Sequence, residues 1–259
     1  TGLRILVAED NAINQRLAQR LLEKRGHSVV IADNGREALA AIDKRPFDLV
    51  LMDVQMPEMG GLEATAAIRN REKTTGEHLP IVAITARAMV GDRERCIAAG
   101  MDGYVSKPIQ SAQLFETVGR LTSSAAKEAA QSAESAFAVQ SDHLKIVDKE
   151  WALEQIDGDE ELLAEMSAIF LKGYREQLCS LRTAVDRGNT QAIAAQAHAI
   201  KGSVGSFGAR AASQAALQIE EIAKRGDLTH ASEALRTLDA ALRQLDPILS
   251  GFARKARKG

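Results

Sequence analysis

The 259-residue sequence has few aromatic residues, few cysteines and no long apolar run. Aromatic residues make up 3% of the chain, which argues against a surface that stacks nucleic-acid bases. The net charge of -2 predicts no attraction to nucleic acid or to an anionic membrane surface. No apolar segment approaches the roughly 18 residues that a membrane span needs, and the amino terminus has no signal-peptide pattern. We therefore expect no membrane contact by this chain.

The two cysteines, Cys96 and Cys179, are too few and too far apart for a disulfide framework or a metal-ligand pattern. A reducing, cytoplasmic setting is the natural expectation. The chain begins at Thr1 and enters an apolar strand pattern almost at once, LRILVAED. This beginning suggests a segment cut from a longer protein.

Short apolar runs alternate with helical patterns five times in the first 122 residues. The central run is LVLMDVQMP at 49–57, which is apolar until it stops at an acid and a proline. The runs occupy residues 3–8, 28–32, 49–53, 79–85 and 103–106. Continuous apolar strands are typical of parallel sheets that are buried on both faces. The alternation predicts a doubly wound α/β domain with a five-stranded parallel sheet.

Polar side chains stand where four of these predicted strands end. They are Glu9, Asp10, Asp53, Thr85 and Lys107. Each alone could simply cap a loop, but the carboxyl ends of parallel strands meet at one edge, where open α/β sheets bind ligands. Three carboxylates packed together need a cation, and oxygen ligands suit Mg²⁺. With an ammonium and a hydroxyl nearby, the cluster predicts a site for a phosphoryl group.

Residues 3–122 resemble a response-regulator receiver domain, and AEDNAINQ at 8–15 resembles the receivers of hybrid histidine kinases in particular. The resemblance implies a flavodoxin-like fold in which Asp53 accepts the phosphoryl group. It also implies that Glu9, Asp10 and the backbone carbonyl of Gln55 help to hold Mg²⁺. A dehalogenase-like phosphatase is the enzyme alternative, but it requires a second Asp where Gln55 stands.

The same resemblance assigns roles to residues of the later strands. Thr85 and Tyr104 would form a switch pair that reports phosphorylation, and Lys107 would hold the phosphate. The Lys107–Pro108 bond is a candidate cis peptide. The sequence departs from the family at Gly60-Gly61, where an Asp often precedes the glycine, and we expect a more flexible loop there.

Residues 123–147 are rich in Ala, Ser, Glu and Gln and predict a linker, either a helical arm or a tether. Every later segment is predicted to be helical, with glycines at the breaks. The expected helices span residues 149–156, 160–187, 190–206, 209–225 and 228–249. Four substantial helices with short connections predict an all-α four-helix bundle over residues 148–252.

One segment of this bundle carries a candidate nucleophile, His198. The apolar residues Ile193, Ala197, Ile200, Val204 and Phe207 recur at helical spacing and form the predicted buried stripe. His198 falls on a different side, so we expect it to face water. An exposed histidine without a role is the ordinary alternative, and its neighbours argue against it.

These neighbours are Lys201, Gly202 and Gly205, which share the side of His198. The glycines cost helix stability, about 1 kcal/mol each, and would clear the surface for another protein. Lys201 could neutralise a phosphoryl group on the imidazole. The glycines also resemble a nucleotide-binding loop, but no strand precedes them and no Gly-Lys-Ser/Thr follows.

The run HAIKGSVGSFGA at 198–209 is similar to the H-x-L-K-G core of histidine phosphotransfer (HPt) domains, with Ile200 in place of leucine. The two resemblances together imply a phosphorelay. Asp53 would accept a phosphoryl group from an upstream histidine kinase domain and exchange it, with Mg²⁺, with His198. His198 would then pass it to a downstream response regulator. On this view the bundle contributes the nucleophile and no acid or base of its own.

No ATP-binding motif is present, so we do not expect the chain to phosphorylate itself from ATP, and its status as an enzyme is undecided. The parent would be a bacterial hybrid histidine kinase, with any inner-membrane anchor outside this chain. The competing hypothesis is a switch in which phosphorylation of the receiver controls binding by the helical domain and His198 is incidental. Transfer within one chain or between chains is equally compatible with the linker.

Overall fold

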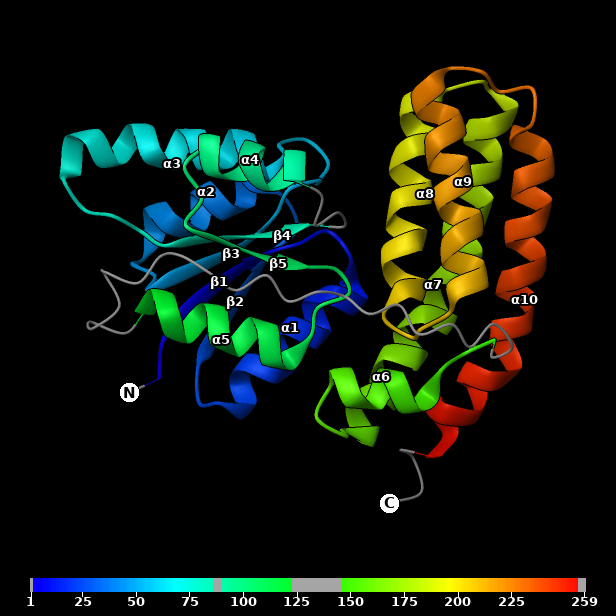
Figure 1. Cartoon of the computed structure of the whole chain (residues 1–259), viewed down its shortest axis with the longest axis horizontal. Helices are drawn as coiled ribbons and strands as arrows, with labels where there is room; N and C mark the ends of the chain where they lie inside the picture. The colour runs from blue at the N-terminus through cyan, green and yellow to red at the C-terminus, as the bar shows by residue number, and fades with distance from the viewer. Residues whose placement is uncertain (1, 86–89, 123–145, 256–259) are drawn as a thin grey trace.

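The computed structural model describes residues 2–85, 90–122 and 146–255. Within them an α/β unit lies beside an upright helical bundle (Figure 1). The predicted linker over 123–147 falls almost wholly on residues 123–145, which lie outside the described ranges. The predicted domain limits therefore stay predictions.

The sheet has five parallel strands in the order β2-β1-β3-β4-β5, as the sequence predicts. The strands are β1 (Arg4–Ala8), β2 (Ser28–Ala32), β3 (Leu49–Asp53), β4 (Ile81–Thr85) and β5 (Gly103–Ser106). Every residue of β3 and β4 is buried, because helices cover both faces of the sheet. The parallel order places the ends of β1, β3, β4 and β5 along one edge.

Five helices cover the two faces of the sheet (Figure 1). They are α1 (Ala12–Lys24) and α5 (Ser111–Thr122) on one face, and α2 (Gly35–Lys44), α3 (Gly61–Thr75) and α4 (Val90–Ala98) on the other. Alternate strand residues enter the two hydrophobic clusters, with Val7 on the α1 side and Leu6 on the α2 side. Asn11 caps α1, since its side chain accepts hydrogen bonds from the amides of Ile13 and Asn14.

The second half is helical throughout its described residues. Its helices are α6 (Lys149–Gln155), α7 (Glu160–Asp186), α8 (Thr190–Gly205), α9 (Arg210–Arg225) and α10 (Ala231–Lys255). The four long helices form the predicted bundle, although α10 continues beyond the expected end at residue 249. Asp159 and Asn189 cap α7 and α8 through side-chain hydrogen bonds. Among the described helices, none is both long enough and apolar enough to cross a membrane.

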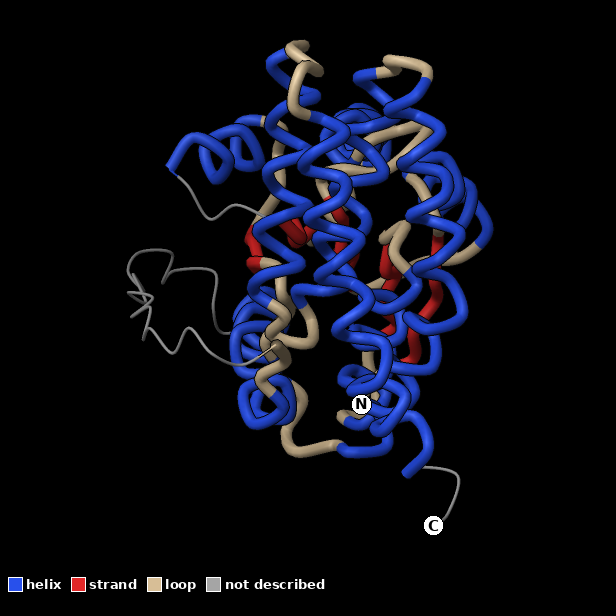
Figure 2. Tube along the Cα trace, turned by 90° about the vertical axis from the view of Figure 1, so that its right-hand side faces the viewer, coloured by secondary structure: helices blue, strands red, loops and turns tan. Residues whose placement is uncertain are grey.

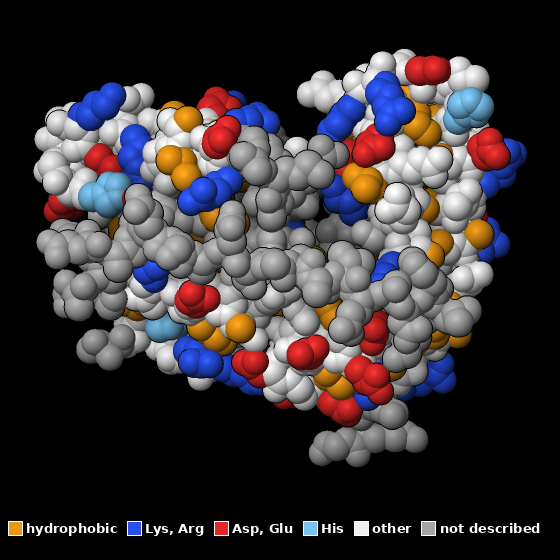
Figure 3. Space-filling model, in the orientation of Figure 1, with side chains coloured by type: hydrophobic (Ala, Val, Ile, Leu, Met, Phe, Trp, Pro, Cys, Tyr) orange, Lys and Arg blue, Asp and Glu red, His pale blue; other side chains and the backbone are white. Residues whose placement is uncertain are grey.

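The bundle packs directly against the α/β unit. Helix α1 contacts α7 and α8, and one hydrophobic cluster runs from the α1 and α5 side of the sheet into the bundle core. Figure 2 shows the bundle helices in front of the sheet when the molecule is turned by 90°. In the space-filling view a notch separates the two units at the upper edge, and basic side chains lie along its bundle wall (Figure 3). Both units therefore contribute to the surface between them.

Candidate functional site

Three carboxylates meet at the edge where β1 and β3 end. Glu9 and Asp10 directly follow β1, and Asp53 is the last residue of β3. One oxygen from each lies within 4.8 Å of the others. Glu9 and Asp53 are fully buried, whereas Asp10 is exposed. The predicted convergence of these side chains is confirmed.

Lys107 joins two of the acids. Its Nζ lies 2.6 Å from Asp53 Oδ2 and 2.9 Å from Glu9 Oε2. Burial lowers the pKa of Lys107, but the two carboxylates outweigh this effect and raise the pKa above its ordinary value. The ammonium therefore stays charged beside Asp53. The Lys107–Pro108 peptide is cis, as predicted.

The acids still carry more negative charge than Lys107 can balance. Although part of Asp10 is exposed at the surface, partial desolvation of its carboxylate by the surrounding protein and the charge of Glu9 raise the pKa of Asp10 to about 6. The same two causes raise the pKa of Asp53. Oε2 of Glu9 is buried, and among the described residues it has the ion pair with Lys107 Nζ but no well-aligned hydrogen-bond donor. These features fit a divalent cation with oxygen ligands, so Glu9, Asp10 and Asp53 are the residues that would hold Mg²⁺.

Two further predicted residues, Thr85 and Gln55, lie around Asp53. Thr85 ends β4, is buried and lines the same cavity as Asp53 and Gln55. The amide of Gln55 donates a hydrogen bond to Asp53 Oδ1 at 3.1 Å. Tyr104 lies half-buried on β5, with the Arg93 guanidinium 5.9 Å from its ring centre. The metal-binding role of the Gln55 carbonyl and the switch role of Thr85 and Tyr104 stay predictions.

The Gly60-Gly61 pair has a steric role that the sequence does not reveal. A Cβ atom on Gly61 would lie 2.1 Å from the backbone oxygen of Asp53, and one on Gly60 would lie 3.3 Å from that of Val54. The Gly61 amide also donates to Val54 O at 3.1 Å. The loop is therefore packed closely against the backbone of Asp53 and Val54, and this close approach requires a glycine at position 61.

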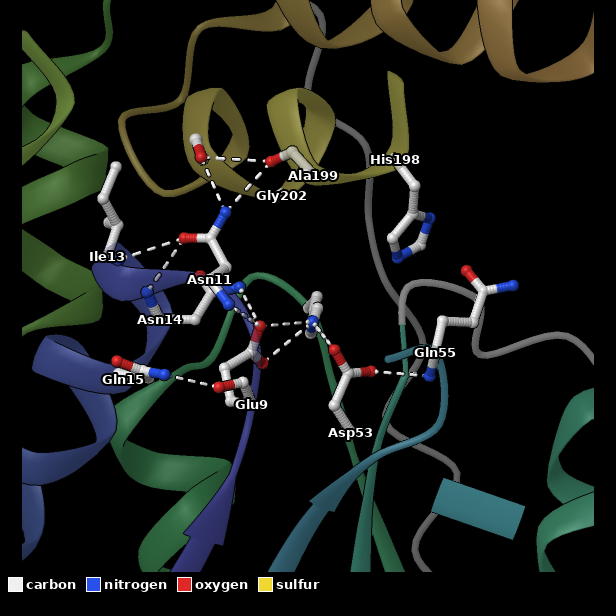
Figure 4. A network of polar contacts seen from close by, with 12 residues as sticks. Glu9, Asn11, Ile13, Asn14, Gln15, Asp53, Gln55, His198, Ala199 and Gly202 are labelled. Atoms are coloured by element: carbon white, nitrogen blue, oxygen red, sulfur yellow. Dashed lines mark hydrogen bonds and ion pairs between the residues drawn. The ribbon is translucent and has the colours of Figure 1, made fainter. Parts of the chain in front are cut away.

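His198 extends from α8 toward this edge. Figure 4 shows its imidazole pointing toward Asp53 and Gln55. The predicted stripe, Ile193, Ala197, Ile200, Val204 and Phe207, is buried in the bundle, so His198 lies off the core as expected. The expectation that it faces water is wrong, because the α/β unit covers that side of α8 and only 14% of the side chain is exposed.

Glu220 on α9 is the main partner of this histidine. Its Oε1 lies 3.3 Å from His198 Nδ1, its Oε2 accepts a hydrogen bond from Lys201 Nζ at 2.6 Å, and Lys224 also binds it. Burial raises the pKa of Glu220, but hydrogen bonds from these three residues outweigh it, and the net pKa is well below the ordinary value. The bundle therefore places an ionised carboxylate beside its candidate nucleophile, a group not identified from the sequence; the expectation that the bundle supplies no catalytic acid or base stays a prediction.

An ionised Glu220 determines the protonation of the imidazole. A carboxylate can only accept, so Nδ1 carries the proton of neutral His198 and Nε2 keeps its lone pair. Burial lowers the pKa of His198, which favours the neutral ring. The geometry thus presents an unprotonated Nε2 as a nucleophile.

The neighbours of His198 lie partly as predicted. Lys201 lines the cavity with His198, although its nearest partner is Glu220. A Cβ on Gly202 would lie 3.5 Å from Asn14 Nδ2, so the α/β unit approaches this glycine closely. Gly205 has open space around it. The absence of a side chain at Gly202 therefore allows this close approach, and the role of both glycines in phosphotransfer stays a prediction.

Asn11 and Asn14 form contacts between the units that the sequence did not suggest. Asn11 Nδ2 donates to Ser203 Oγ at 2.7 Å and to Ala199 O at 3.0 Å (Figure 4). Ser206 Oγ donates to Asn14 Oδ1 at 3.3 Å, and Asn14 Nδ2 donates to Glu9 Oε1 at 3.1 Å. A chain of hydrogen bonds therefore runs from α8 to the acidic edge.

One cavity of about 350 Å³ contains the candidate reactive groups of both units. Asp53 and Thr85 line it from the sheet, and His198 lines it from α8. Basic side chains of both units also line it, namely Arg95, Lys201 and Lys224. Such a cavity can hold a small anionic group between a carboxylate and an imidazole.

Two family models match the chain. The response regulator receiver domain matches residues 5–119, and the Hpt domain matches residues 165–247. The chain is a receiver domain joined to an Hpt domain. The α/β unit is the receiver, and the bundle is the Hpt domain. This pair of domains is that of a phosphorelay protein.

Similar proteins include hybrid kinases. The sensor histidine kinase GacS of Pseudomonas protegens is 35% identical over 93% of the receiver–Hpt chain and 26% of its own length. Hybrid signal transduction histidine kinase I of Dictyostelium discoideum is 47% identical over 44% of the chain and 7% of its own length. The chain thus spans about a quarter of the GacS relative.

A solved structure that covers the receiver half is the receiver domain of sensor histidine kinase PA1611 from Pseudomonas aeruginosa, described with a magnesium ion in its active-site cleft. It is 37% identical, covers 47% of this chain and 98% of its own, and has a TM-score of 0.44.

Proposed function

We propose that this chain carries a phosphoryl group between Asp53 of the receiver and His198 of the Hpt domain. The observation that supports this most directly is the shared cavity of about 350 Å³, which both side chains line. A nucleophilic carboxylate and a neutral imidazole then need only an in-line approach, because phosphoryl transfer depends mainly on positioning and charge stabilisation.

Transfer from the receiver to the Hpt domain exchanges a P–O bond on Asp53 for a P–N bond on His198. Nε2 of His198 attacks the phosphorus of the Asp53 acyl phosphate, a P–N bond forms, and the P–O bond to Asp53 breaks. The electron pair returns to the carboxylate of Asp53. The Nδ1 proton stays in place, so the phosphorylated ring carries positive charge that Glu220 balances at Nδ1. The reverse transfer uses the same groups.

Basic groups and a metal would lower the charge of the transferring group. Lys107 Nζ lies 2.6 Å from Asp53 Oδ2, and Lys201 and Lys224 line the cavity on the Hpt side. Mg²⁺ held by Glu9, Asp10 and Asp53 would neutralise phosphoryl oxygens when bound. The Gln55 carbonyl would complete the site, and Thr85 and Tyr104 would respond to the phosphoryl group.

The partners follow from the two reactive groups. An upstream histidine kinase domain would supply the phosphoryl group to Asp53, and the receiver of a downstream response regulator would take it from His198. We place this exchange in the cytoplasm, in agreement with Cys96 and Cys179, which are not joined by a disulfide.

Labelling by acetyl phosphate with Mg²⁺ tests the proposal. The intact chain, Asp53→Asn and His198→Gln are compared, and acid-labile phosphohistidine is distinguished from base-labile acyl phosphate. We expect phosphohistidine on the intact chain, none on Asp53→Asn, and acyl phosphate alone on His198→Gln. Acyl phosphate alone on the intact chain would exclude the relay and favour the alternative, a phosphorylation-controlled switch.

A further inference from the structure

The receiver of this chain covers the surface of α8 around His198, whose side chain is 14% exposed. Asn11 contacts α8 at Ala199 and Ser203, and Asn14 lies against Gly202. A second receiver cannot contact Nε2 of His198 while these contacts hold. Delivery to a downstream receiver therefore requires the first one to leave, and the contacts that hold it control this step.

A cluster of oppositely charged side chains joins the receiver to the Hpt domain. It lies outside the cavity that contains Asp53 and His198. We call it the α1–α7 charge cluster. Its members are Arg16, Arg20 and Lys24 of α1, and Asp159, Glu161 and Glu165 at the start of α7. The three basic residues are spaced four residues apart, so they form one basic stripe along α1. The three acidic residues face this stripe, and we call them the acidic patch.

The pairs in this cluster are close. Arg16 Nε lies 2.6 Å from Glu165 Oε2, and an Arg20 terminal nitrogen lies 2.8 Å from Glu161 Oε2. Lys24 Nζ lies 2.5 Å from Asp159 Oδ2, whose side chain is 7% exposed.

These pairs are separate from the chemistry of the relay. None of the six residues lines the cavity that contains Asp53 and His198. The cluster therefore acts on docking and not on the transfer step. Complementary charges at the edge of an interface select partners and fix their orientation.

We propose that the acidic patch is a selective docking surface for a separate receiver domain with a basic stripe on its first helix. The receiver of this chain occupies the patch at rest and so gates delivery from His198. This inference rests on the proposed relay. A downstream receiver would need basic residues on its first helix at the positions that correspond to Arg16, Arg20 and Lys24. It would bind only after the receiver of this chain has left the acidic patch.

Transfer between two chains tests the gate. The donor is His198→Gln, labelled on Asp53 by radioactive acetyl phosphate and freed of excess reagent. The acceptor is Asp53→Asn, whose His198 is intact, and the label that reaches His198 is followed over time. Two charge reversals are placed separately on the acceptor, namely Arg16→Glu with Arg20→Glu, and Glu161→Arg with Glu165→Arg.

Both reversals break the same contact inside the acceptor, but only the first leaves the acidic patch intact. We expect the α1 reversal to raise the transfer rate about tenfold, because it frees His198 for the basic receiver of the donor. The α7 reversal should not raise it, because it repels that receiver. An α1 reversal on the donor should then restore transfer to the α7-reversed acceptor. Both reversals on one acceptor should leave the rate at or below its starting value, because the resident receiver docks again and the donor's basic receiver is still repelled.

Other outcomes overturn the inference. An equal rise for both reversals would show that the patch does not select, and no change for either would show that the cluster does not hold the receiver. Melting curves identify an acceptor that fails to fold, and the rescue by the altered donor excludes a general loss of structure. If the intact chain forms no phosphohistidine, the proposed relay itself fails, which is a different result.

Discussion

His198 Nδ1 and Glu220 Oε1 lie 3.3 Å apart in the Hpt domain. The contact links the phosphorylatable histidine to a buried carboxylate that also binds Lys201 and Lys224. It fixes the proton of the neutral imidazole on Nδ1 and leaves Nε2 free on the side of Asp53.

Removal of the Glu220 carboxylate should therefore release the imidazole tautomer. In Glu220→Ala we expect transfer to His198 to slow about tenfold or more, since a hydrogen bond to a charged group contributes about 1.5–3 kcal/mol. Nitrogen NMR of His198 should show a protonated Nδ1 in the intact chain and a mixture of tautomers in the variant. Glu220→Gln keeps an acceptor oxygen and should lie between the two. An unchanged tautomer in Glu220→Ala would refute this role.

The pH response of His198 should differ from that of a free histidine. Burial lowers its pKa, so the NMR midpoint should fall below the ordinary value of 6.5. Below pH 6.5 the folded chain then binds fewer protons at this site than the unfolded chain. The free energy of unfolding should accordingly decrease as the pH falls through this range, and less so in His198→Gln. A midpoint at or above 6.5 would contradict this environment.

Glycines 202 and 205 provide a matched pair for the domain contact. Both lie in α8, but Gly202 faces Asn14 of the receiver and Gly205 faces open space. Gly202→Gln should weaken docking of the receiver on its own Hpt domain and reduce the rate of transfer from Asp53 to His198 within the chain at least about tenfold. Gly205→Gln should leave this rate within about twofold of the original value. Each substitution removes a helical glycine and should stabilise α8 by up to about 1 kcal/mol. Equal losses of transfer in the two variants would argue against the observed contact.

The metal site can be tested by calorimetric titration with Mg²⁺. Asp10 has a pKa of about 6, so the ion must displace a proton when the pH is lower. We expect Mg²⁺ binding to weaken as the pH falls through 6, by up to about tenfold per unit for one displaced proton. Asp10→Asn should bind Mg²⁺ more weakly and with a smaller pH dependence. Binding that is unchanged in Asp10→Asn would place the ion elsewhere.

Most of the fold could be predicted from the sequence because its signals are local. Apolar runs gave the five strands, and their parallel order brought Glu9, Asp53 and Lys107 to one edge. The helical stripe of α8 likewise separated Ile200 from His198. Each of these predictions depends only on the periodicity of apolar residues or on the position where a strand ends. None of them requires knowledge of how the two domains dock.

The residues that were missed depend on docking or on contacts between helices. Asn11 reads as a helix cap, and nothing near it indicates that its amide reaches Ser203. The exposure of His198 was mispredicted because the covering surface belongs to the other domain. Glu220 did leave a signal, since it is a charged residue among the buried positions Ala216, Ile219 and Ala223 of α9. A buried acid in an apolar stripe needs partners, but the sequence does not name them.

The central claim is that the phosphoryl group crosses from Asp53 to His198 within one chain. Quenched single-turnover kinetics measure this most directly, with acetyl phosphate removed once Asp53 is labelled and with the chain diluted over a wide range of concentrations. The structure predicts that phosphohistidine appears at a rate that does not change with dilution. A rate that falls in proportion to chain concentration would show transfer between molecules, and acyl phosphate that decays without forming phosphohistidine would contradict the relay.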